Sequence, residues 1–427
     1  MKTNIKTLGL LLMAGMALVA CSSDDTEEQN AQQNNQTWQA YASVSKDMDT
    51  RTLRIGDSDG TPTLLVGWST TEKVYAYRGA NLVGTLSPTQ TTNSSITDMS
   101  GSLEGNAYTV DETISLRFPR ETVDYTGQDG TLATIAEKYD YAEGATKVSS
   151  VTGTNVQLNN AILTSKQAIV KFTFNKPVQV VSIYSTRMTE PILVQPSTAT
   201  TEIYAALPLL SGSVSADYVL SGVDNQNKQF MVTKTGVTMQ NGKYYAANIK
   251  LIYPTYVDLG LSVYWNAYNM AASDITAKGN GYAWGEKTTK ETYTLENYKW
   301  YNSSTQKYTR YVLDSQYGSV DNLSTLLELD DVARNLGEGY RMPTKAECEE
   351  LVNNCIVKGF TLNGKTYRMF ISTKSAAKGR AIIFIDNWAI WTSTLDSTVN
   401  AYRMSGGGSI SSFNRATDYS VRPVLTK

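Results

Sequence analysis

The residue types that most often carry chemistry are sparse in this chain. It contains no histidine and only three cysteines, Cys21, Cys348 and Cys355. Without histidine there is no Ser-His-Asp triad, no imidazole metal ligand and no imidazole general base. Ser375–Lys378 matches an S-x-x-K motif, but the K-T-G that should follow it comes earlier, at Lys234–Gly236. We therefore expect no enzyme, no cofactor and no metal site; a glycosidase using two carboxylates is the remaining enzymatic alternative.

Cys21 has a different chemical setting, at the end of a targeting segment. Lys2 and Lys6 precede a largely apolar run of thirteen residues, Leu8 to Ala20. That run is too short to span a bilayer as a helix, which takes about 20 residues. Leu18–Ala20 resembles a bacterial lipobox, so residues 1–21 are predicted to be a lipoprotein signal in which the Cys21 thiol carries a diacylglycerol. An ordinary secretory peptide is the alternative.

Residues 22–37 are predicted to be an unstructured tether. Asp24, Asp25, Glu27 and Glu28 follow the cysteine closely, and a Gln/Asn-rich stretch comes next. The acidic run resembles the signal that exports lipoproteins to the outer face of the cell in Bacteroidota. We expect a surface-exposed outer-membrane lipoprotein, with the outer membrane as a partner through the lipid anchor.

Composition favours a surface β protein. The 427 residues suggest about three globular units. Charged residues make up only 18%, below the roughly 25% of typical soluble domains, and the net charge is −2. We therefore expect no nucleic-acid partner. Tyrosine, with 27 residues against 8 phenylalanines, suits half-exposed strand positions.

The first two units are predicted to be β-sandwiches, residues 38–176 and 177–254. Apolar and polar residues alternate in short runs separated by turn residues. Pro177 is expected to end a strand that begins at Ala168, and Asn241-Gly242 to form a tight hairpin. One short helix is expected within these units. The strands expected from the alternation are 38–45, 73–77, 114–118, 168–174 and 244–252, and the helix is 132–138.

The third unit, residues 255–427, contains the one predicted helix that begins with an N-terminal capping motif. Thr344 and Glu347 form the spacing of a capping box at the start of that helix. Cys348 and Cys355 would lie on its core-facing side, about 10.5 Å apart along the axis, which is too far for a disulfide. We expect two free, buried, unreactive thiols.

Aromatic and polar residues near the C-terminus could bind a sugar ring or a peptide surface. The candidate ligand-binding residues are Asp386, Asn387, Trp388, Tyr402 and Arg403. The alternative is that the aromatics belong to the core and the polar residues cap turns. Glu286 and Arg422 are expected to form a buried ion pair, and Asp396-Ser397-Thr398 fits a short O-glycosylation pattern.

Residues 38–252 resemble the fimbrillin (Mfa-like) family of pilus subunits, which are built from two transthyretin-like β-sandwiches. The matching segments are Asp49–Thr52, Trp68, Lys73–Tyr75, Asp129–Ala133 and Gly242–Tyr245. The resemblance implies that a trypsin-like protease cuts after an arginine that follows the first strand, here Arg51 or Arg54. Loss of that strand would open a groove that a strand from a neighbouring fimbrial subunit fills.

Residues 256–427 resemble the FISUMP domain, which is related to the C-type-lectin-like fold. The matching segments are Val257–Val263, Tyr282–Glu286, Tyr340–Thr344, Trp391–Thr394 and Ser420–Val424. The calcium-binding tripeptide and the Trp-Asn-Asp run of such lectins are both missing. The predicted fold is mainly β: two transthyretin-like β-sandwich domains followed by an α+β C-type-lectin-like domain.

Two functions remain open from the sequence. The first is a fimbrial tip adhesin that accepts a donor strand and presents a lectin-like domain to a host or dietary glycan or a matrix protein. A tip position is expected because the strand ending at Ile252 runs straight into another domain and so cannot be donated. The second is a surface glycan-capture lipoprotein that never polymerises.

Overall fold

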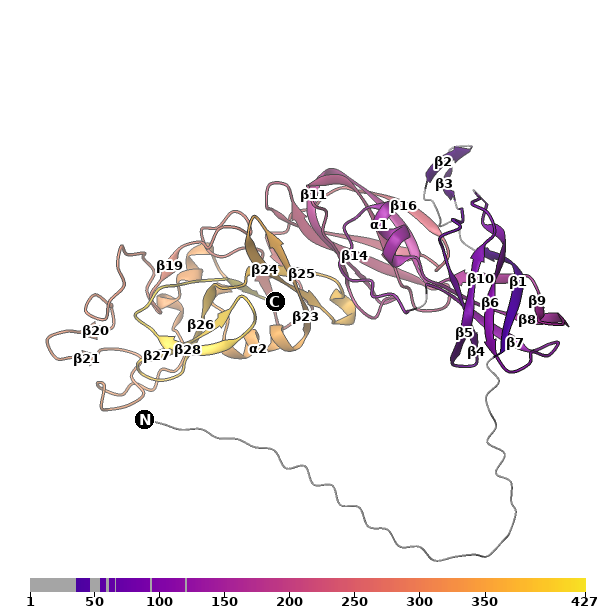
Figure 1. Ribbon diagram of the computed structural model, residues 1–427. Coiled ribbons are helices and arrows are strands. Elements are labelled where there is room, and N and C mark those ends of the chain that lie inside the picture. Colours follow the sequence, from indigo (N-terminus) through magenta and orange to yellow (C-terminus); the bar gives the residue numbers. More distant parts are fainter. Residues whose placement is uncertain (1–35, 47–53, 59–60, 66, 93, 120) are drawn as a thin grey trace, which may run out of the picture.

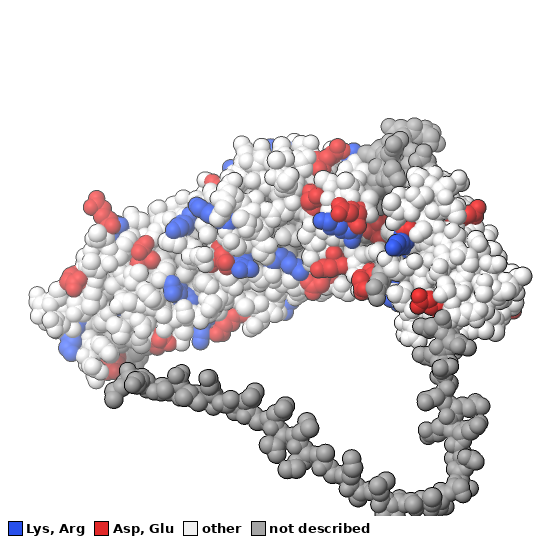
Figure 2. Space-filling model, viewed as in Figure 1, with Lys and Arg blue, Asp and Glu red and all other residues white. Residues whose placement is uncertain are grey.

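The computed structural model describes residues 36–46, 54–58, 61–65, 67–92, 94–119 and 121–427, and this part of the chain is mainly β (Figure 1). Three units follow one another along the chain: an N-terminal β unit (β1 and β4–β10), a middle β unit (β11–β16) and a C-terminal unit (β17–β30 with α2). The middle unit lies between the other two (Figure 1). Both signs of charge are interspersed on the face seen in Figure 2, without a broad basic patch.

The N-terminal β unit is one sheet that closes on itself. The strand order is β10-β1-β6-β5-β4-β7-β8-β9, and β9 also pairs with β1 while β10 also pairs with β8. A separate two-stranded hairpin follows β1. The strands are β1 (Gln36–Lys46), β4 (Val74–Arg78), β5 (Asn81–Pro88), β6 (Ile96–Gly105), β7 (Thr113–Phe118), β8 (Ala142–Thr152), β9 (Asn155–Leu158) and β10 (Ala161–Ser165), with the hairpin β2 (Arg54–Ser58) and β3 (Thr61–Leu65).

Alternation in the sequence predicted three of these strands. The strands expected at 38–45, 73–77 and 114–118 correspond to β1, β4 and β7. The expected helix is confirmed as α1 (Leu132–Thr134), which continues as one π-helical turn, Ile135–Tyr139. The Thr131 side chain caps this helix by accepting a hydrogen bond from the Thr134 amide.

The middle β unit is organised around one long strand. β11 (Ala168–Ser185) pairs with β13 and β16 through its first half and with β12 and β14 through its second half. It therefore belongs to two faces of the unit at once. The other strands are β12 (Ile192–Val194), β13 (Thr200–Leu207), β14 (Ser215–Asp224), β15 (Gln229–Thr238) and β16 (Tyr244–Ile249).

Two sequence expectations about this unit are wrong. Pro177 does not end the strand, because the ladder shifts register between Thr173 and Val178 and absorbs the proline at that irregularity. Asn241-Gly242 is a turn but not a hairpin, because β16 pairs in parallel with β11 and not with β15. The Asn241 side chain instead bonds the backbone of Leu209, donating to its carbonyl and accepting from its amide.

The C-terminal unit combines small sheets with one helix, α2 (Lys345–Asn353). A four-stranded sheet contains β17 (Tyr256–Val257), β18 (Val263–Asn266), β22 (Tyr340–Arg341) and β30 (Val424–Thr426). A five-stranded sheet contains β19 (Gly281–Tyr282), β26 (Ala389–Leu395), β27 (Asn400–Ser405), β28 (Ile410–Asn414) and β29 (Tyr419–Ser420). The remaining elements are β23 (Cys355–Leu362), β24 (Lys365–Ser372), β25 (Ala381–Ile385), β20 (Tyr301–Asn302), β21 (Lys307–Tyr308) and the 3-10 turns Glu328–Asp330, Val332–Leu336 and Ser375–Ala377.

The predicted capping box at the start of α2 is confirmed. Thr344 accepts from the Glu347 amide, and the Glu347 carboxylate accepts from the Thr344 amide. The prediction that Cys355 lies on this helix is wrong, because α2 ends at Asn353 and Cys355 begins β23.

Candidate functional site

The first strand is held in the N-terminal β unit from both sides. β1 pairs antiparallel with β6 along ten residue pairs, from Gln36↔Gly105 to Ser45↔Ile96. On its other side it pairs in parallel with β9 and then with β10. β1 is therefore the strand that closes the sheet, and its removal would leave two sheet edges facing each other across a gap.

Alternate side chains of β1 fill the core of this unit. Trp38, Ala40, Ala42 and Val44 are all buried, whereas Tyr41 on the opposite face is exposed. The inward row consists mostly of apolar side chains that a replacement strand could match at every second position. Trp38 also donates from its indole nitrogen to the Gly105 carbonyl, at 3.2 Å.

A buried ion pair ends this inward row. Lys46 continues the parity of Val44, and its Nζ donates to Asp140 Oδ1 at 2.5 Å. The two side chains are 0% and 1% exposed. Lys46 Nζ also lies 5.0 Å from the centre of the Phe118 ring. The sequence did not predict this ion pair. The signal that could have revealed it is a lysine at a position of the alternating strand where an apolar residue is expected.

The residues expected to be processed follow β1 directly. Arg51 and Cys21 lie outside the described residues, so their predicted roles stay predictions. Arg54 is the first residue of β2 and faces Leu65 in the β2–β3 hairpin. The sequence therefore passes from the strand that closes the sheet, through residues 47–53, into a separate hairpin. Lys46 itself is buried, which shields it from a protease.

The five predicted ligand-binding residues do not form one cluster. Asp386 pairs with Arg368 at 2.8 Å, and Trp388 donates to Ser420 Oγ at 2.6 Å. Tyr402 and Arg403 are neighbours on β27 and therefore point to opposite faces.

The side chains of Tyr402 and Arg403, on opposite faces of β27, take part in different cation–π contacts. Lys345 lies 4.4 Å from the Tyr402 ring, while the Arg403 guanidinium stacks 4.5 Å from the rings of both Phe413 and Tyr419. Asn387 is exposed in the turn between β25 and β26. A shared ligand for all five side chains would have to extend over several surfaces.

The predicted Glu286–Arg422 ion pair is wrong. The buried Glu286 carboxylate pairs with Lys290 at 2.7 Å and accepts from the Lys299 amide. Arg422 is buried and forms no ion pair with a carboxylate of the described residues. It donates to Asn269 Oδ1 and to three backbone carbonyls. Sequence spacing could not show that carbonyls rather than an acid would surround this guanidinium.

Cys348 and Cys355 are free, as predicted; Cys348 is buried, whereas Cys355 is only partly buried. Burial raises the pKa of the Cys348 thiol far above its usual value and that of Cys355 to about 12. Both are therefore protonated at neutral pH and are poor nucleophiles. In the proposed glycosylation triplet, Thr398 is buried and accepts from the amides of Leu313 and Asp314, whereas Ser397 is partly exposed.

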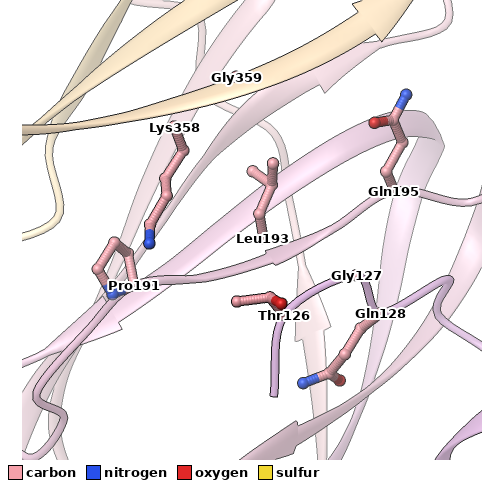
Figure 3. Close-up of a pocket in the computed structure, with 8 residues that line it drawn as sticks. All are labelled: Thr126, Gly127, Gln128, Pro191, Leu193, Gln195, Lys358 and Gly359. Atoms are coloured by element: carbon pink, nitrogen blue, oxygen red, sulfur yellow. The ribbon is translucent and has the colours of Figure 1, made fainter. Parts of the chain in front are cut away.

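A cavity of about 390 Å³ lies where the middle and C-terminal units meet (Figure 3). Its polar side chains are already engaged: Lys358 pairs with Glu190 at 3.2 Å, and Gln195 donates to the Thr361 carbonyl at 2.6 Å. Gln128 is buried and exchanges hydrogen bonds with the backbone of Ala206. The cavity thus offers few free polar groups to a ligand. Its lining residues are Thr126, Gly127, Gln128, Pro191, Leu193, Gln195, Lys358 and Gly359.

A second and more polar groove of about 590 Å³ lies beside β19 in the C-terminal unit. Asp418 and Glu291 lie on it, and neither makes a hydrogen bond or ion pair within the part of the chain that the structure describes. Burial raises the pKa of Tyr293, and the Asp418 charge adds to that rise. The groove is lined by Gly279, Asn280, Gly281, Thr289, Lys290, Glu291, Thr292, Tyr293, Thr417 and Asp418.

The positive charge in this second groove is already neutralised. Lys290 donates to Glu286 and to the Asn297 carbonyl. Asp418 approaches the backbone closely, because a Cβ placed on Gly281 would lie 2.6 Å from its Oδ2. The groove therefore offers carboxylates, hydroxyls and an amide with a negative balance. The sequence reasoning missed it, since residues 279–293 and residues 417–418 are far apart in the sequence.

Among the residues that the structure describes, no group of three or more acidic or cysteine side chains could hold a metal ion. None of the helices in those same ranges is long and apolar enough to cross a membrane.

Comparison with known proteins gives loose structural likenesses. No protein-family model and no curated protein matches the chain. The solved structures it resembles include the tip fimbrial protein Mfa3 from Porphyromonas gingivalis with a C-terminal truncation, at 8% identity and a TM-score of 0.29, covering 51% of this chain and 96% of that one. A fimbrial assembly protein from Parabacteroides distasonis matches at 13% identity and a TM-score of 0.26, covering 50% and 92%. At such TM-scores the likeness establishes no function for this chain.

Proposed function

We propose that this protein is a cell-surface fimbrial subunit that accepts a donor strand in place of β1 and presents its C-terminal unit as an adhesive domain. The observation that carries the proposal is the position of β1. β1 lies between β6 on one side and β9 and β10 on the other, and so closes the sheet. Its inward side chains fill the core. Cleavage at Arg51 or Arg54 would cut the covalent link between β1 and the rest of the fold.

The proposed place of the subunit is the tip of the fimbria. β16, the last strand of the middle unit, is fixed at its far end, because Leu251 donates its amide to Asn175 Oδ1 and the Ile252 carbonyl accepts from the Met231 amide. The chain then enters β17 at Tyr256. A strand held at both ends cannot be given to a neighbour, so this subunit can accept a strand but not donate one.

The test is to sequence the N-terminus of the protein recovered from shed surface material and to mix the mature protein with stalk subunits. A start at Thr52 or Ile55 and termination of growing fimbriae are expected. Incorporation at internal positions would contradict the tip position. An intact lipidated Cys21 in every copy would favour a fixed glycan receptor, although an uncut anchor subunit at the fimbrial base would give the same result.

We further propose that the polar groove beside β19 is the ligand face of the adhesive unit and binds neutral saccharides. Asp418 can accept two hydroxyl hydrogens, and the threonine hydroxyls and Asn280 supply further donors and acceptors. The negative balance of the groove disfavours sialylated or sulfated glycans. β19 belongs to the part of the molecule that points away from the N-terminal β unit (Figure 1).

An array of neutral and anionic glycans probed with the full chain tests this assignment. Asp418→Asn should lower binding of neutral glycans at least about tenfold by removing one charge-assisted acceptor. Gly281→Ala should do the same by displacing the carboxylate. Glu338→Gln, which neutralises an exposed acid outside the groove lining, is the matched control. Preference for anionic glycans, or equal binding by all variants, would contradict the assignment.

A further inference from the structure

The row of inward-facing side chains on β1 ends in a positively charged residue, Lys46, whose carboxylate partner, Asp140, lies outside this strand. Trp38, Ala40, Ala42 and Val44 are followed at the same parity by Lys46. Its ammonium group contacts Asp140 at 2.5 Å where both side chains are almost fully buried. Four positions of this face therefore select apolar groups, whereas the fifth selects a cation.

Asp140 does not belong to β1 and would stay behind if the strand left. It follows the π-helical turn that ends at Tyr139, and it also accepts a hydrogen bond from Gln167 Nε2 at 3.3 Å. Gln167 is itself buried and accepts from the Tyr125 hydroxyl and the Tyr141 amide. The carboxylate is thus held in place by groups outside β1, so its position is preorganised for whichever strand occupies the gap.

We propose that the strand replacing β1 must carry a lysine or arginine at the position that Lys46 fills, and that Asp140 selects partners by this cation. The inference rests on the proposed function, since it names the chemistry of the donor strand. A strand with an apolar residue there loses the charged hydrogen bond to a buried carboxylate, and an acidic residue adds repulsion. Apolar alternation alone would admit many strands, so the buried charge supplies the discrimination.

Labelled synthetic peptides with the β1 sequence, residues 36–46, provide the test. The full chain is cut with trypsin, β1 is displaced by excess peptide, and uptake is measured by fluorescence anisotropy. The peptide ending in Lys46 should bind at least about 30-fold more tightly than the Lys46→Met peptide, since truncating one partner of a buried charge pair costs that much or more. A Lys46→Glu peptide should bind more weakly still, and a Ser43→Ala peptide should match the native one.

The Asp140→Asn protein makes the test reciprocal. With this protein the order should reverse, and the Lys46→Met peptide should bind more tightly than the Lys46 peptide, because a buried ammonium group without its carboxylate is costly. Equal binding of the two peptides to the unsubstituted protein would overturn the cation requirement while leaving strand acceptance intact. Failure of every peptide, the native one included, would overturn both proposals.

A second measurement applies to the uncut chain. Lys46→Met should lower the unfolding temperature, and adding Asp140→Asn should recover part of the loss, because a buried charge pair is worst when one partner is missing. If Lys46→Met unfolds at the same temperature as Ser43→Ala, Asp140 does not depend on the cation and the inference fails.

Discussion

Arg422 carries a positive charge into the interior and is held there almost entirely by carbonyl dipoles. It donates to the carbonyls of Asn266, Ala267 and Ile383, and it lies 4.3 Å from the centre of the Phe384 ring. Burial lowers the pKa of its guanidinium to about 9, so the group is still charged at pH 7. The side chain joins β25 to the segment after β18, which makes it a structural residue of the C-terminal unit.

Replacing this arginine should be costly. Arg422→Met leaves buried carbonyl oxygens without donors, and we expect a loss of about 3–5 kcal/mol in the free energy of unfolding. Denaturant unfolding followed by tryptophan fluorescence measures this loss. Arg368→Met is the matched control, because Arg368 forms only a partly exposed pair with Asp386 and should cost about 1 kcal/mol or less. Equal losses for the two variants would contradict the role given to Arg422.

The capping box of α2 also makes a prediction about pH. Burial raises the pKa of Glu347, but hydrogen bonds from Arg341 and from the Thr344 amide outweigh it and leave the pKa below its usual value. A carboxyl group that binds its proton less tightly in the folded protein than in the unfolded chain stabilises the folded protein. This stabilisation is fully present when the pH is above the unfolded pKa of about 4.5. That stabilisation is lost as the pH falls through the lower folded value.

Glu347→Gln should therefore flatten the dependence of stability on pH below about pH 5. The measurement is the free energy of unfolding between pH 3 and pH 6 for the unsubstituted protein and the variant. Glu349→Gln, a change at an exposed site on the same helix, should keep the original slope. A steeper slope in Glu347→Gln would show that the sign is wrong.

At the scale of the element, β5, β6 and β1 approach one another through glycine. Gly101 in β6 faces Ala40 of β1 and Leu86 of β5. A Cβ placed on Gly101 would lie 1.9 Å from the Thr85 carbonyl oxygen, which is backbone and cannot rotate away. The close approach of these strands therefore requires glycine at this position.

Gly101→Ala should force β5 away from β6 and cost about 1–3 kcal/mol of stability, as overpacking does elsewhere. β6 forms the longest ladder with β1. The trypsin-treated variant should therefore also release the labelled synthetic peptide of residues 36–46 faster than the unsubstituted protein does. Ser100→Ala, one residue away, should change stability by less than about 0.5 kcal/mol. Unaltered stability and release in Gly101→Ala would contradict the steric argument.

Local sequence signals predicted individual strands and helices. The features that these signals did not predict depend on pairing between residues far apart in the sequence. Alternation predicted β1, and the spacing of Thr344 and Glu347 predicted the start of α2, because both depend on neighbours in the sequence. Pro177 and Asn241-Gly242 misled because the partner of a strand is chosen by the whole unit. The Lys46–Asp140 pair joins residues 94 positions apart, so only its lysine was visible beforehand.

At the scale of the whole molecule, the middle and C-terminal units share one core. Phe174, Phe230 and Ile183 of the middle unit pack in the same cluster as Phe360, Tyr367 and other apolar side chains of β23–β25. Buried hydrogen bonds cross the junction as well: Ser221 Oγ donates to the Gly379 carbonyl at 2.9 Å, and Gln229 Nε2 donates to the Ala381 carbonyl at 2.7 Å. The two units are therefore expected to fold together.

A boundary drawn at residue 255 consequently cuts through a core. A fragment of residues 255–427 would expose Phe360, Tyr367, Met369 and Ile383 to water, and we expect it to aggregate or to melt without a sharp transition. A fragment of residues 166–427 retains both sides of the cluster and should melt in one cooperative step. Size-exclusion chromatography and calorimetry distinguish these outcomes. A monomeric 255–427 fragment with a sharp transition would contradict the shared core, because it would show that the C-terminal unit folds without the side chains of the middle unit.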